Sequence, residues 1–562
     1  MNIQVPPALQ RRVRGHESNA RLREAGRKLV NDAIVSVQGF PEVRVCLFDD
    51  WSANPLDSRS WQWAVAAFRF IPSLIAYHAE SGDQAAIDWA RRALRSWNRA
   101  VAGPLRDYEF ASNDHAVANQ AESLVFLLAY LDGLGIEEGF REEIAAAIHR
   151  HADLLATDDF YSRHTNHGIE QSRILAVVGD LFPGDARSAD RLRIAVDRLQ
   201  DELEFSFTRE GVHVENSPGY HCYVCLSFLK IVDYFPREEV GELAAKVDEL
   251  MPKAMRFITQ VARPDGTLPV IGDTVNEPVP DYFRRYRKTR DYRRLQYAST
   301  DGLKGSRPVD TLGYYPQAGY AVVRDDWFPP GEGHRAFHLV FKCGFRSRYH
   351  RHDDDLNLVL YHGGEDWLID SGAFGYAEQH PVRRYVRSKW GHNVPVVQVP
   401  RAKRWEWSFP PATTPLLRLP AASGESAFRG VTHSYPGCIA TRDLHVRPAA
   451  REFTVVDTLV QTGKPARRHH LSLWHFPADK EVEIEGQRVV VTSTRTGNRL
   501  VIENLGRAAT HVRLVDPEVD GVEGAVASRF TGKTEPARLL AFEWRANHLH
   551  AALRFRLIEG GN

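Results

Sequence analysis

The feature that most constrains the fold is a change in the spacing of apolar residues near Gly313. Before it, apolar residues recur three and four positions apart, as Leu192, Ala195, Leu199 and Leu203 do. That spacing places them on one face of a helix. After it, short segments alternate apolar and other residues, which is typical of strands with one buried face. The sequence therefore predicts a run of helices followed by a run of strands.

Two consecutive domains follow from this order, because helices and strands that are segregated along a chain form separate layers or domains. Residues 1–310 are expected to form an α-helical domain, a multi-helix bundle or toroid of antiparallel neighbours joined by short links. Residues 311–562 are expected to form an antiparallel β-sandwich. A length of 562 residues agrees, since it exceeds what one hydrophobic core normally fills.

Individual elements can be placed on the same pattern. Helices are expected over residues 60–81, 83–101, 113–135, 140–157 and 187–207. Strands are expected within residues 320–327, 336–344, 356–361, 366–370, 482–494, 499–506 and 549–559. The strands over 356–361 and 366–370 should form a hairpin, because the sequence between them, HGGE, has the composition of a turn.

The overall charge excludes no substrate by itself, since Lys plus Arg and Asp plus Glu are both 72. An acidic ligand must then be bound by a local basic groove. The stretch DYFRRYRKTRDYRRLQY is the densest basic segment, and it fits a solvated helix face, an acidic glycan or nucleic acid. We expect this segment to form a solvated helix face or to bind an acidic glycan, and we expect no nucleic-acid partner.

The N-terminal sequence lacks the apolar core of a signal peptide, and the chain has no apolar run of about 18 residues. We therefore expect no transmembrane segment and a cytoplasmic protein, or a periplasmic one if a leader is missing from the sequence. Five cysteines are too few and too scattered for a disulfide framework. Cys222 and Cys225 have CxxC spacing in an apolar helical pattern and are expected to be buried.

The histidine-rich stretch RSRYHRHDDD suggests a metal site. It contains His350 and His352, and Asp370 and His392 follow downstream. Imidazole and carboxylate are donors that suit Zn²⁺ or a similar divalent ion. The alternative is that these are ordinary structural histidines, since the chain has 24. On a strand, the side chains of His350 and His352 would point to the same face. One of them can face a cleft and bind a metal only if the backbone bends or the two histidines have different functions.

Two further stretches in the helical half carry reactive side chains. SRHTNHGIEQSR supplies Asn166, His167 and Glu170 at the start of a helix, where Asn166 could instead be a cap. REGVHVENSPGYHCYV supplies Tyr220, which could instead be a core residue. With His350, these groups meet the needs of β-elimination beside a uronic acid carboxylate: a donor that neutralises the carboxylate, a base and an acid.

Five sequence blocks, in order, resemble the heparinase II/III family of polysaccharide lyases. The blocks are NHGIE, NSPGYH, PDGTLPVIGD, HRHDDDLNLVLYHGGEDWLIDSGAFGY and RSKWGHN. The resemblance extends from about residue 160 to 400 and implies an incomplete (α/α) toroid followed by an antiparallel β-sandwich. It also implies an acidic, uronate-containing polysaccharide as substrate.

The resemblance implies a role for each matching residue. Asn166 and His167 would neutralise the carboxylate, and Glu170 would bind substrate. Tyr220 would be the acid and, for one epimer, also the base, and His350 the base or its partner. The implied ligands of a structural metal, usually zinc, are His352, Asp370 and His392.

The sequence departs from the family pattern after His352, where Asp353, Asp354 and Asp355 follow in place of small residues. One of them could compete with Asp370 as the metal-binding carboxylate.

Further substrate contacts are expected from Asp114 and His115, although helix capping explains Asp114 equally well. Polyanion contacts are expected from Arg284, Arg287, Arg384 and Arg387. The oligomeric state stays open, with a homodimer as one option.

Two other functions remain open at this point. A glycoside hydrolase on the same scaffold would need two carboxylates, and Glu170, Asp273 and Glu215 are available. A glycan-binding or assembly protein would use the aromatic and arginine-rich surface without catalysis. A cupin is disfavoured, because Leu356 and Asn357 stand where the cupin pattern needs Glu.

Overall fold

The computed structural model describes residues 3–398, 415–435, 437–462 and 468–560. The chain forms two compact units: unit 1 is Met1–Ser206 with Ser227–Val247, and unit 2 is Phe207–Leu226 with Asp248–Asn562. Helices α10 (Pro218–Tyr234) and α11 (Arg237–Val261) therefore each contribute to both units. The predicted boundary at residue 310 falls within unit 2, between its last helix before the sheets and its first strand, and stays a prediction.

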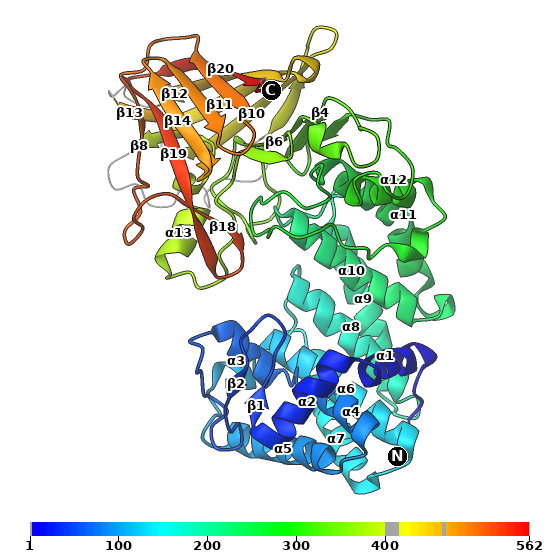
Figure 1. Cartoon of the computed structure of the whole chain (residues 1–562). Helices are drawn as coiled ribbons and strands as arrows, with labels where there is room; N and C mark the ends of the chain where they lie inside the picture. The colour runs from blue at the N-terminus through cyan, green and yellow to red at the C-terminus, as the bar shows by residue number, and fades with distance from the viewer. Residues whose placement is uncertain (1–2, 399–414, 436, 463–467, 561–562) are drawn as a thin grey trace. The chain divides into compact units, whose positions relative to one another are not determined.

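Unit 1 is built mainly from helices (Figure 1). They are α1 (Pro7–Glu17), α2 (Ala20–Asp32), α3 (Arg59–Ala66), α4 (Ile71–Ser81), α5 (Ala85–Ala102), α6 (Asp114–Leu134), α7 (Glu138–Leu155), α8 (Asn166–Leu181) and α9 (Ser188–Ser206), with a small hairpin of β1 (Ile34–Val35) and β2 (Val43–Arg44). The predicted helices over residues 83–101, 113–135, 140–157 and 187–207 correspond to α5, α6, α7 and α9.

Helix α6 forms the centre of unit 1. Its residues from Ala116 to Leu131 are buried without interruption, and it packs against α4, α7 and α8. A helix that is buried on every side must be largely apolar, as the sequence LVFLLAYL within it is.

The predicted helix over residues 60–81 is instead two helices, α3 and α4. The backbone turns at Phe68, which has φ +56°. Two side chains of α6 donate hydrogen bonds to backbone carbonyls at the end of α3. Gln120 Nε2 donates to Ala66 O at 2.8 Å, and Ser123 Oγ donates to Ala67 O at 3.0 Å. Tertiary hydrogen bonds thus satisfy a helix end that the continuous apolar pattern does not reveal.

Unit 2 carries three antiparallel sheets (Figure 1). The first has the order β3 (Leu312–Tyr315), β4 (Tyr320–Arg324), β5 (His338–Lys342), β6 (Asn357–His362), β7 (Glu365–Leu368). The second has the order β14 (Lys480–Glu485), β15 (Arg488–Ser493), β16 (Arg499–Asn504), β20 (Leu549–Ile558), β12 (Glu452–Gln461), β11 (Cys438–Arg447), β10 (Ser426–Tyr435), β9 (Leu416–Leu419). The third has the order β17 (His511–Leu514), β19 (Lys533–Ala546), β13 (Arg468–Pro477), β8 (Pro395–Gln398), with β18 (Val526–Phe530) beside β19. Unit 2 also holds α12 (Arg290–Ser299) and α13 (Pro381–Arg387).

One hydrophobic core joins these sheets. Strand β11 alternates buried and more exposed residues along its whole length, so only one of its faces is covered. The buried face belongs to a core that includes Trp367 of β7 and Trp474 of β13, from the other two sheets, and Phe555 of β20, from the same sheet, each fully buried. Each fully buried side chain of this size contributes roughly 1.5–3 kcal/mol relative to exposure.

The predicted hairpin is present as β6 and β7, with His362 paired to Glu365. The two residues between them are Gly363 and Gly364, with φ of +64° and +74°. Two consecutive positive φ angles are what a tight two-residue hairpin turn requires, and glycine adopts them at little cost.

Among the described residues, no helix has both the length and the apolar character needed to cross a membrane. Cys222 and Cys225 are buried and carry free thiols, as expected.

Candidate active site and metal site

A stacked pair of side chains, Tyr220 and His350, forms the centre of the candidate active site in unit 2. Their ring centroids lie 3.5 Å apart, and the ring planes are inclined by 22°. The Tyr220 hydroxyl lies 2.7 Å from the hydroxyl of Tyr376, a side chain that is 54% exposed. The structure thus brings together the two predicted acid-base residues, and Tyr376, the last residue of the fourth sequence block, joins them although the sequence predicted no role for it.

The surroundings favour the neutral form of the Tyr220 phenol. Burial, the neighbouring Tyr376 and the negative charges of Asp273 and Glu215 raise its pKa well above the usual value. A phenol that keeps its proton can donate it to a leaving group.

The start of α10 fixes the position of Tyr220. Ser217 Oγ accepts a hydrogen bond from Tyr220 N at 3.3 Å and lies 2.8 Å from Thr274 Oγ1. Asn216 Nδ2 donates to Ser347 O at 2.8 Å, which ties this turn to the loop that carries His350. Three of the sequence blocks therefore meet at one place.

The H-x-H sequence does not lie on a strand. His350 and His352 are in the loop between β5 and β6, and His350 has φ +52°. The backbone therefore bends between the two histidines, and they serve different neighbours. His350 stacks on Tyr220, whereas His352 lies with Asp370 and His392.

One carboxylate, Asp273, contacts both histidines. Its Oδ2 lies 2.8 Å from His350 Nδ1, and its Oδ1 lies 2.9 Å from His352 Nε2. Arg383 holds the same carboxylate through Nη1 to Oδ1 and Nη2 to Oδ2. Burial opposes the ionised form, but the hydrogen bonds from the two histidines and Arg383 hold the pKa of Asp273 well below its usual range.

The sequence suggested Asp273 only as a carboxylate for hydrolysis, and it passed over Arg383 in favour of Arg384 and Arg387. The signal available was the position of Asp273 at the end of the block PVIGD.

A second buried carboxylate, Glu215, flanks the pair. Its Oε2 lies 3.5 Å from His350 Nε2 and 3.4 Å from His213 Nε2. Both distances exceed those of a strong hydrogen bond. Glu215 therefore adds negative charge beside His350 without holding it as tightly as Asp273 does.

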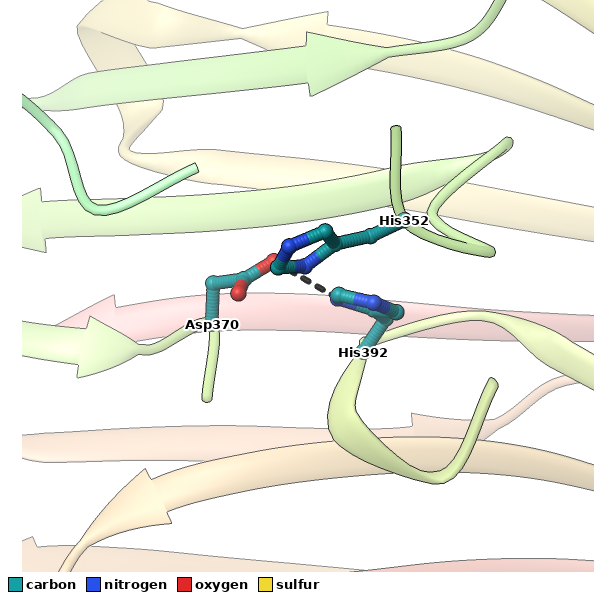
Figure 2. A group of neighbouring side chains, drawn as sticks. All are labelled: His352, Asp370 and His392. Atoms are coloured by element: carbon teal, nitrogen blue, oxygen red, sulfur yellow. Dashed lines mark hydrogen bonds and ion pairs between the residues drawn. The ribbon is translucent and has the colours of Figure 1, made fainter. Parts of the chain in front are cut away.

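The predicted metal ligands His352, Asp370 and His392 form a cluster inside unit 2 (Figure 2). Their potential ligand atoms all lie within 4.8 Å of one another, and the three residues are no more than 2% exposed. His392 Nδ1 lies 2.8 Å from Asp370 Oδ2, and the charge and hydrogen bond of Asp370, acting against burial, raise the pKa of His392.

The cluster fits a divalent ion. Within the described part of the chain, His352 Nδ1 and His392 Nε2 are buried and have no hydrogen-bond partner. Leaving such atoms unpaired costs free energy unless something binds them. Two imidazoles and a carboxylate are donors that zinc accepts.

Among the three aspartates after His352, none belongs to this cluster of described residues, although Asp354 is buried and feels the charges of His352 and His392. Asp355 already binds Gly344 N, Arg351 and Thr432. Both carboxylate oxygens of Asp354 are buried and, among the described residues, lack a hydrogen-bond partner. Burial raises the pKa of Asp354, while the nearby charges of Lys342, His392 and His352 lower it.

Unit 1 gathers a second set of predicted residues. His167, in the first turn of α8, lies with its Nδ1 3.0 Å from Asp114 Oδ2. The ring of His115 stacks on His167 with centroids 4.4 Å apart, and Trp63 stacks on His115 at 4.8 Å. Asp114, His115 and His167 thus form one group, which the sequence had placed in separate stretches.

Neighbouring groups oppose the effect of burial on the pKa of Asp114, whereas the charge of His167 adds to the effect of burial on the pKa of His115. Burial raises the pKa of Asp114, but hydrogen bonds from His167 and Ser162 outweigh it and leave that pKa below its usual range. Burial and the charge of His167 lower the pKa of His115 to about 4. His115 is therefore neutral near pH 7.

Helix capping does not explain Asn166 or Asp114. The N-cap of α8 is Thr165, whose side chain accepts from Gly168 N, and the N-cap of α6 is Asn113. Asn166 and Asp114 are each the first residue inside a helix.

Glu170, also on α8, lies in the interior of unit 1, and its charge acts to raise the pKa of His115 against burial. It is 4% exposed and accepts hydrogen bonds from Arg173 at 2.6 Å and from Ser227 at 3.0 Å. Arg173 in turn pairs with the buried Glu122. This environment is that of an interior ion pair, and the substrate contact of Glu170 stays a prediction.

The predicted basic residues differ in exposure. Arg284 and Arg287 are exposed near α12, and Arg284 pairs with Asp281. Arg384 is exposed and donates to Asp520 O at 3.1 Å. Arg387 is buried, and donates to Glu378 and to the carbonyl of Arg351.

Comparison with known proteins yields a consistent family. The family description Heparinase II/III N-terminus matches residues 9–296, and Heparinase II/III-like, C-terminal matches residues 307–555. A heparin-sulfate lyase of Bacteroides thetaiotaomicron is 22% identical over 357 residues, which are 58% of this chain and 50% of that protein. The chain thus spans about half the length of this curated relative.

Solved structures show the same fold. A heparinase III structure is 15% identical and has a TM-score of 0.80, with 97% of this chain and 86% of that chain covered. The heparan sulfate lyase of Pedobacter heparinus is 18% identical and has a TM-score of 0.66, with 97% and 84% covered. These similarities confirm the predicted fold class, a helical toroid followed by an antiparallel β-sandwich. Because the two family descriptions together match most of the chain, this protein belongs to the heparinase II/III family.

Proposed function

We propose that this protein is a polysaccharide lyase that cleaves a uronate-containing polysaccharide by β-elimination. The observation that carries the proposal is the stacked pair of Tyr220 and His350, 3.5 Å apart between ring centroids. An acid and a base at this spacing can act on neighbouring atoms of one sugar ring. The relatives are named for heparin and heparan sulfate, which supports an acidic glycosaminoglycan as the substrate class.

The reaction needs a proton to leave and another to arrive. A base takes the proton from C5 of the uronate, and the C5–H electron pair forms the C4–C5 double bond. The bond from C4 to the glycosidic oxygen breaks, and an acid protonates that oxygen. The C5 proton becomes acidic only when the carboxylate beside it is neutralised by donors.

Tyr220 is the proposed acid, because its raised pKa keeps the hydroxyl protonated. The hydroxyl of Tyr376, at 2.7 Å, can exchange a hydrogen bond with it and orient it. The phenol proton would go to the leaving oxygen.

His350 is the proposed base. The ionised Asp273 accepts a hydrogen bond from Nδ1 at 2.8 Å, which leaves the lone pair on Nε2. The neutral imidazole would take the C5 proton at Nε2, and Asp273 would stabilise the resulting cation.

Asn166 and His167 are the proposed partners of the uronate carboxylate, a role that the family resemblance implies. Asp114 holds His167 at Nδ1, which directs Nε2 away from the protein's own carboxylate. An amide N–H and an imidazole N–H are suitable donors to a carboxylate.

His352, Asp370 and His392 would hold a divalent ion, zinc by donor chemistry. When bound, the ion would cross-link the loops that carry these residues and so brace the sandwich. The acid-base groups Tyr220 and His350 are outside this ligand set.

The experiment is a screen of the purified protein against heparan sulfate, hyaluronan, alginate and bacterial exopolysaccharides, followed by the ultraviolet absorbance of the unsaturated product. On the best substrate, Tyr220→Phe and His350→Gln should each lower kcat by about 10²–10⁴-fold, the usual contribution of a general acid or base. Tyr77→Phe, which removes a hydroxyl bonded to Asp83 in unit 1, is the matched control and should keep full activity.

Other outcomes would identify other functions. New reducing ends without ultraviolet absorbance would indicate a glycoside hydrolase and contradict elimination. Binding without cleavage that is unchanged in Tyr220→Phe would indicate a glycan-binding protein.

A further inference from the structure

Asp273 stands out among the buried carboxylates because two histidines with different tasks share it. Its two oxygens accept from His350 Nδ1 at 2.8 Å and from His352 Nε2 at 2.9 Å. His350 belongs to the acid-base pair, and His352 belongs to the metal-binding cluster. The side chain of Asp273 is 1% exposed, so water does not compete for it.

The carboxylate has little freedom to move. Arg383 binds both of its oxygens, and Arg383 itself is buried and also donates to Ala373 O at 2.9 Å. A two-point contact between a guanidinium and a carboxylate fixes the orientation of the carboxylate plane. The positions of both histidine rings therefore depend on one clamped group.

The same contacts determine which ring nitrogen carries the proton in each histidine. An ionised carboxylate only accepts hydrogen bonds, so His350 must carry its proton on Nδ1 and His352 on Nε2. The lone pair of neutral His350 is then on Nε2. The lone pair of His352 is on Nδ1, the buried atom that has no hydrogen-bond partner among the described residues.

We propose that Asp273 is a positioning residue for both sites: it sets the tautomer of His350 for proton abstraction and that of His352 for metal binding. This inference rests on the proposed function for its catalytic half, while its metal half stands on the ligand cluster alone. Carboxylates that hold a metal-binding histidine by its second nitrogen strengthen metal binding, and carboxylates that hold a basic histidine keep it in the working tautomer.

The test is Asp273→Asn in the full-length protein, with zinc as the probe. Asparagine keeps the shape but cannot accept from both histidines, because one of its two terminal atoms is a donor. Zinc affinity, from competition with a coloured chelator, should fall about 10- to 100-fold, as it does when such outer partners are removed. At saturating zinc, kcat should fall by about 10²-fold or more, while KM stays within roughly threefold because substrate contacts are unchanged.

The matched control is Asp366→Asn. Asp366 also receives two hydrogen bonds from one arginine, Arg263, at 2.8 and 2.9 Å, but contacts neither histidine. It should lower stability without changing zinc affinity or kcat. If Asp273→Asn does not fold, Arg383→Lys serves instead, since it keeps the charge and loosens the clamp, and both readouts should change in the same direction by smaller factors.

Three results would overturn the inference. Zinc affinity and kcat could both survive in folded Asp273→Asn, only one of them could change, or Asp366→Asn could match its effects. Failure of the proposed function is distinct: if the unaltered protein cleaves no polysaccharide, the zinc arm still applies. In that case the tautomer of His350 is measured in place of kcat, from the ¹⁵N signals of labelled histidine. The signal of His350 is assigned as the one missing in His350→Gln. If that tautomer is the same in Asp273→Asn as in the unaltered protein, Asp273 does not set it and the inference is rejected.

Discussion

At the scale of single residues, Glu202 of α9 is the most unusual carboxylate of unit 1. It is fully buried, and its Oε1 accepts hydrogen bonds from Tyr161 at 2.6 Å and from His164 N at 2.8 Å. It thus anchors the loop that leads into α8 and its first-turn residues. Burial raises its pKa to about 7, although the two hydrogen bonds and the charge of Arg163 act in the opposite direction and Asp201 adds to the rise.

This environment predicts a pH-dependent loss of stability that Glu202→Gln should remove. Below about pH 4.5 the carboxyl is protonated in both the folded and the unfolded chain and contributes nothing. Between pH 4.5 and about 7 the unfolded chain ionises while the folded one keeps its proton, so stability falls. Above pH 7 the full cost, roughly 3 kcal/mol for a shift of this size, is present.

Glutamine resembles the neutral acid and pays no such cost. Urea unfolding at pH 5 and pH 8.5 should show Glu202→Gln gaining roughly 2–3 kcal/mol over the unaltered protein at the higher pH only. Glu204→Gln is the control, because Glu204 is exposed and forms a surface ion pair with Lys246. Equal gains at both pH values would contradict the assignment.

At the scale of elements, the first turn of α8 is packed directly against the loop before it. A Cβ on Gly168 would lie 2.5 Å from Ser162 O and 2.6 Å from Glu202 Oε1, which is closer than atoms can pack. We therefore expect Gly168→Ala to lower the free energy of unfolding by about 1–3 kcal/mol through overpacking. It should also lower activity, because Asn166 and His167 belong to the same turn.

Gly133 of α6 offers the opposite case. A Cβ there would meet nothing within 4 Å, so Gly133→Ala should be neutral or stabilise by up to about 1 kcal/mol. Denaturant midpoints of the two variants, compared with the unaltered protein, check this pair. A neutral Gly168→Ala would mean that the turn can shift without cost.

An element could be predicted from the sequence when the residues that set its boundary lie at that boundary. The hairpin of β6 and β7 was predictable because Gly363 and Gly364 mark the turn locally. The separation of α3 from α4 was not, because the apolar pattern continues through Phe68 and the open carbonyls are satisfied by Gln120 and Ser123 of another helix. Boundaries set by tertiary hydrogen bonds leave little trace in local sequence.

At the scale of the whole molecule, the division into two units predicts a local response to metal removal. The proposed metal ligands His352, Asp370 and His392 all belong to unit 2. Zinc at 1,000 times its dissociation constant stabilises the folded state by about 4 kcal/mol. Chelation should therefore lower the unfolding temperature of unit 2 by roughly 5–10 °C.

Hydrogen exchange read by mass spectrometry locates the effect. Peptides from β6 and β7 should lose protection on chelation, and peptides from α5 and α7 should not. His352→Ala is the control, since it lacks a ligand and should show no further change with chelator. Loss of turnover with an unchanged unfolding temperature would contradict a bracing role for the metal.

The site was only partly predictable from the sequence, because some of its residues contact partners that are far away along the chain. Tyr220, His350 and the metal cluster lie in blocks whose side chains suggest chemistry by themselves. Asp273 was missed in its bridging role, because its partners are far away in sequence and nothing local pairs it with them. Glu202 left a signal that can be read in retrospect: it is three residues after Leu199 and so falls on the buried stripe of its helix.

The left-handed backbone conformation of His350 sets a limit on how far this protein can be stabilised at that position. A non-glycine residue at φ +52° carries conformational strain, and a chain selected only to endure heat would replace it with glycine or asparagine. The proposed role of His350 as a base requires an imidazole, which neither glycine nor asparagine supplies. Replacing His350 to relieve this strain would therefore remove the proposed base, so thermal optimisation of this protein should leave position 350 unchanged.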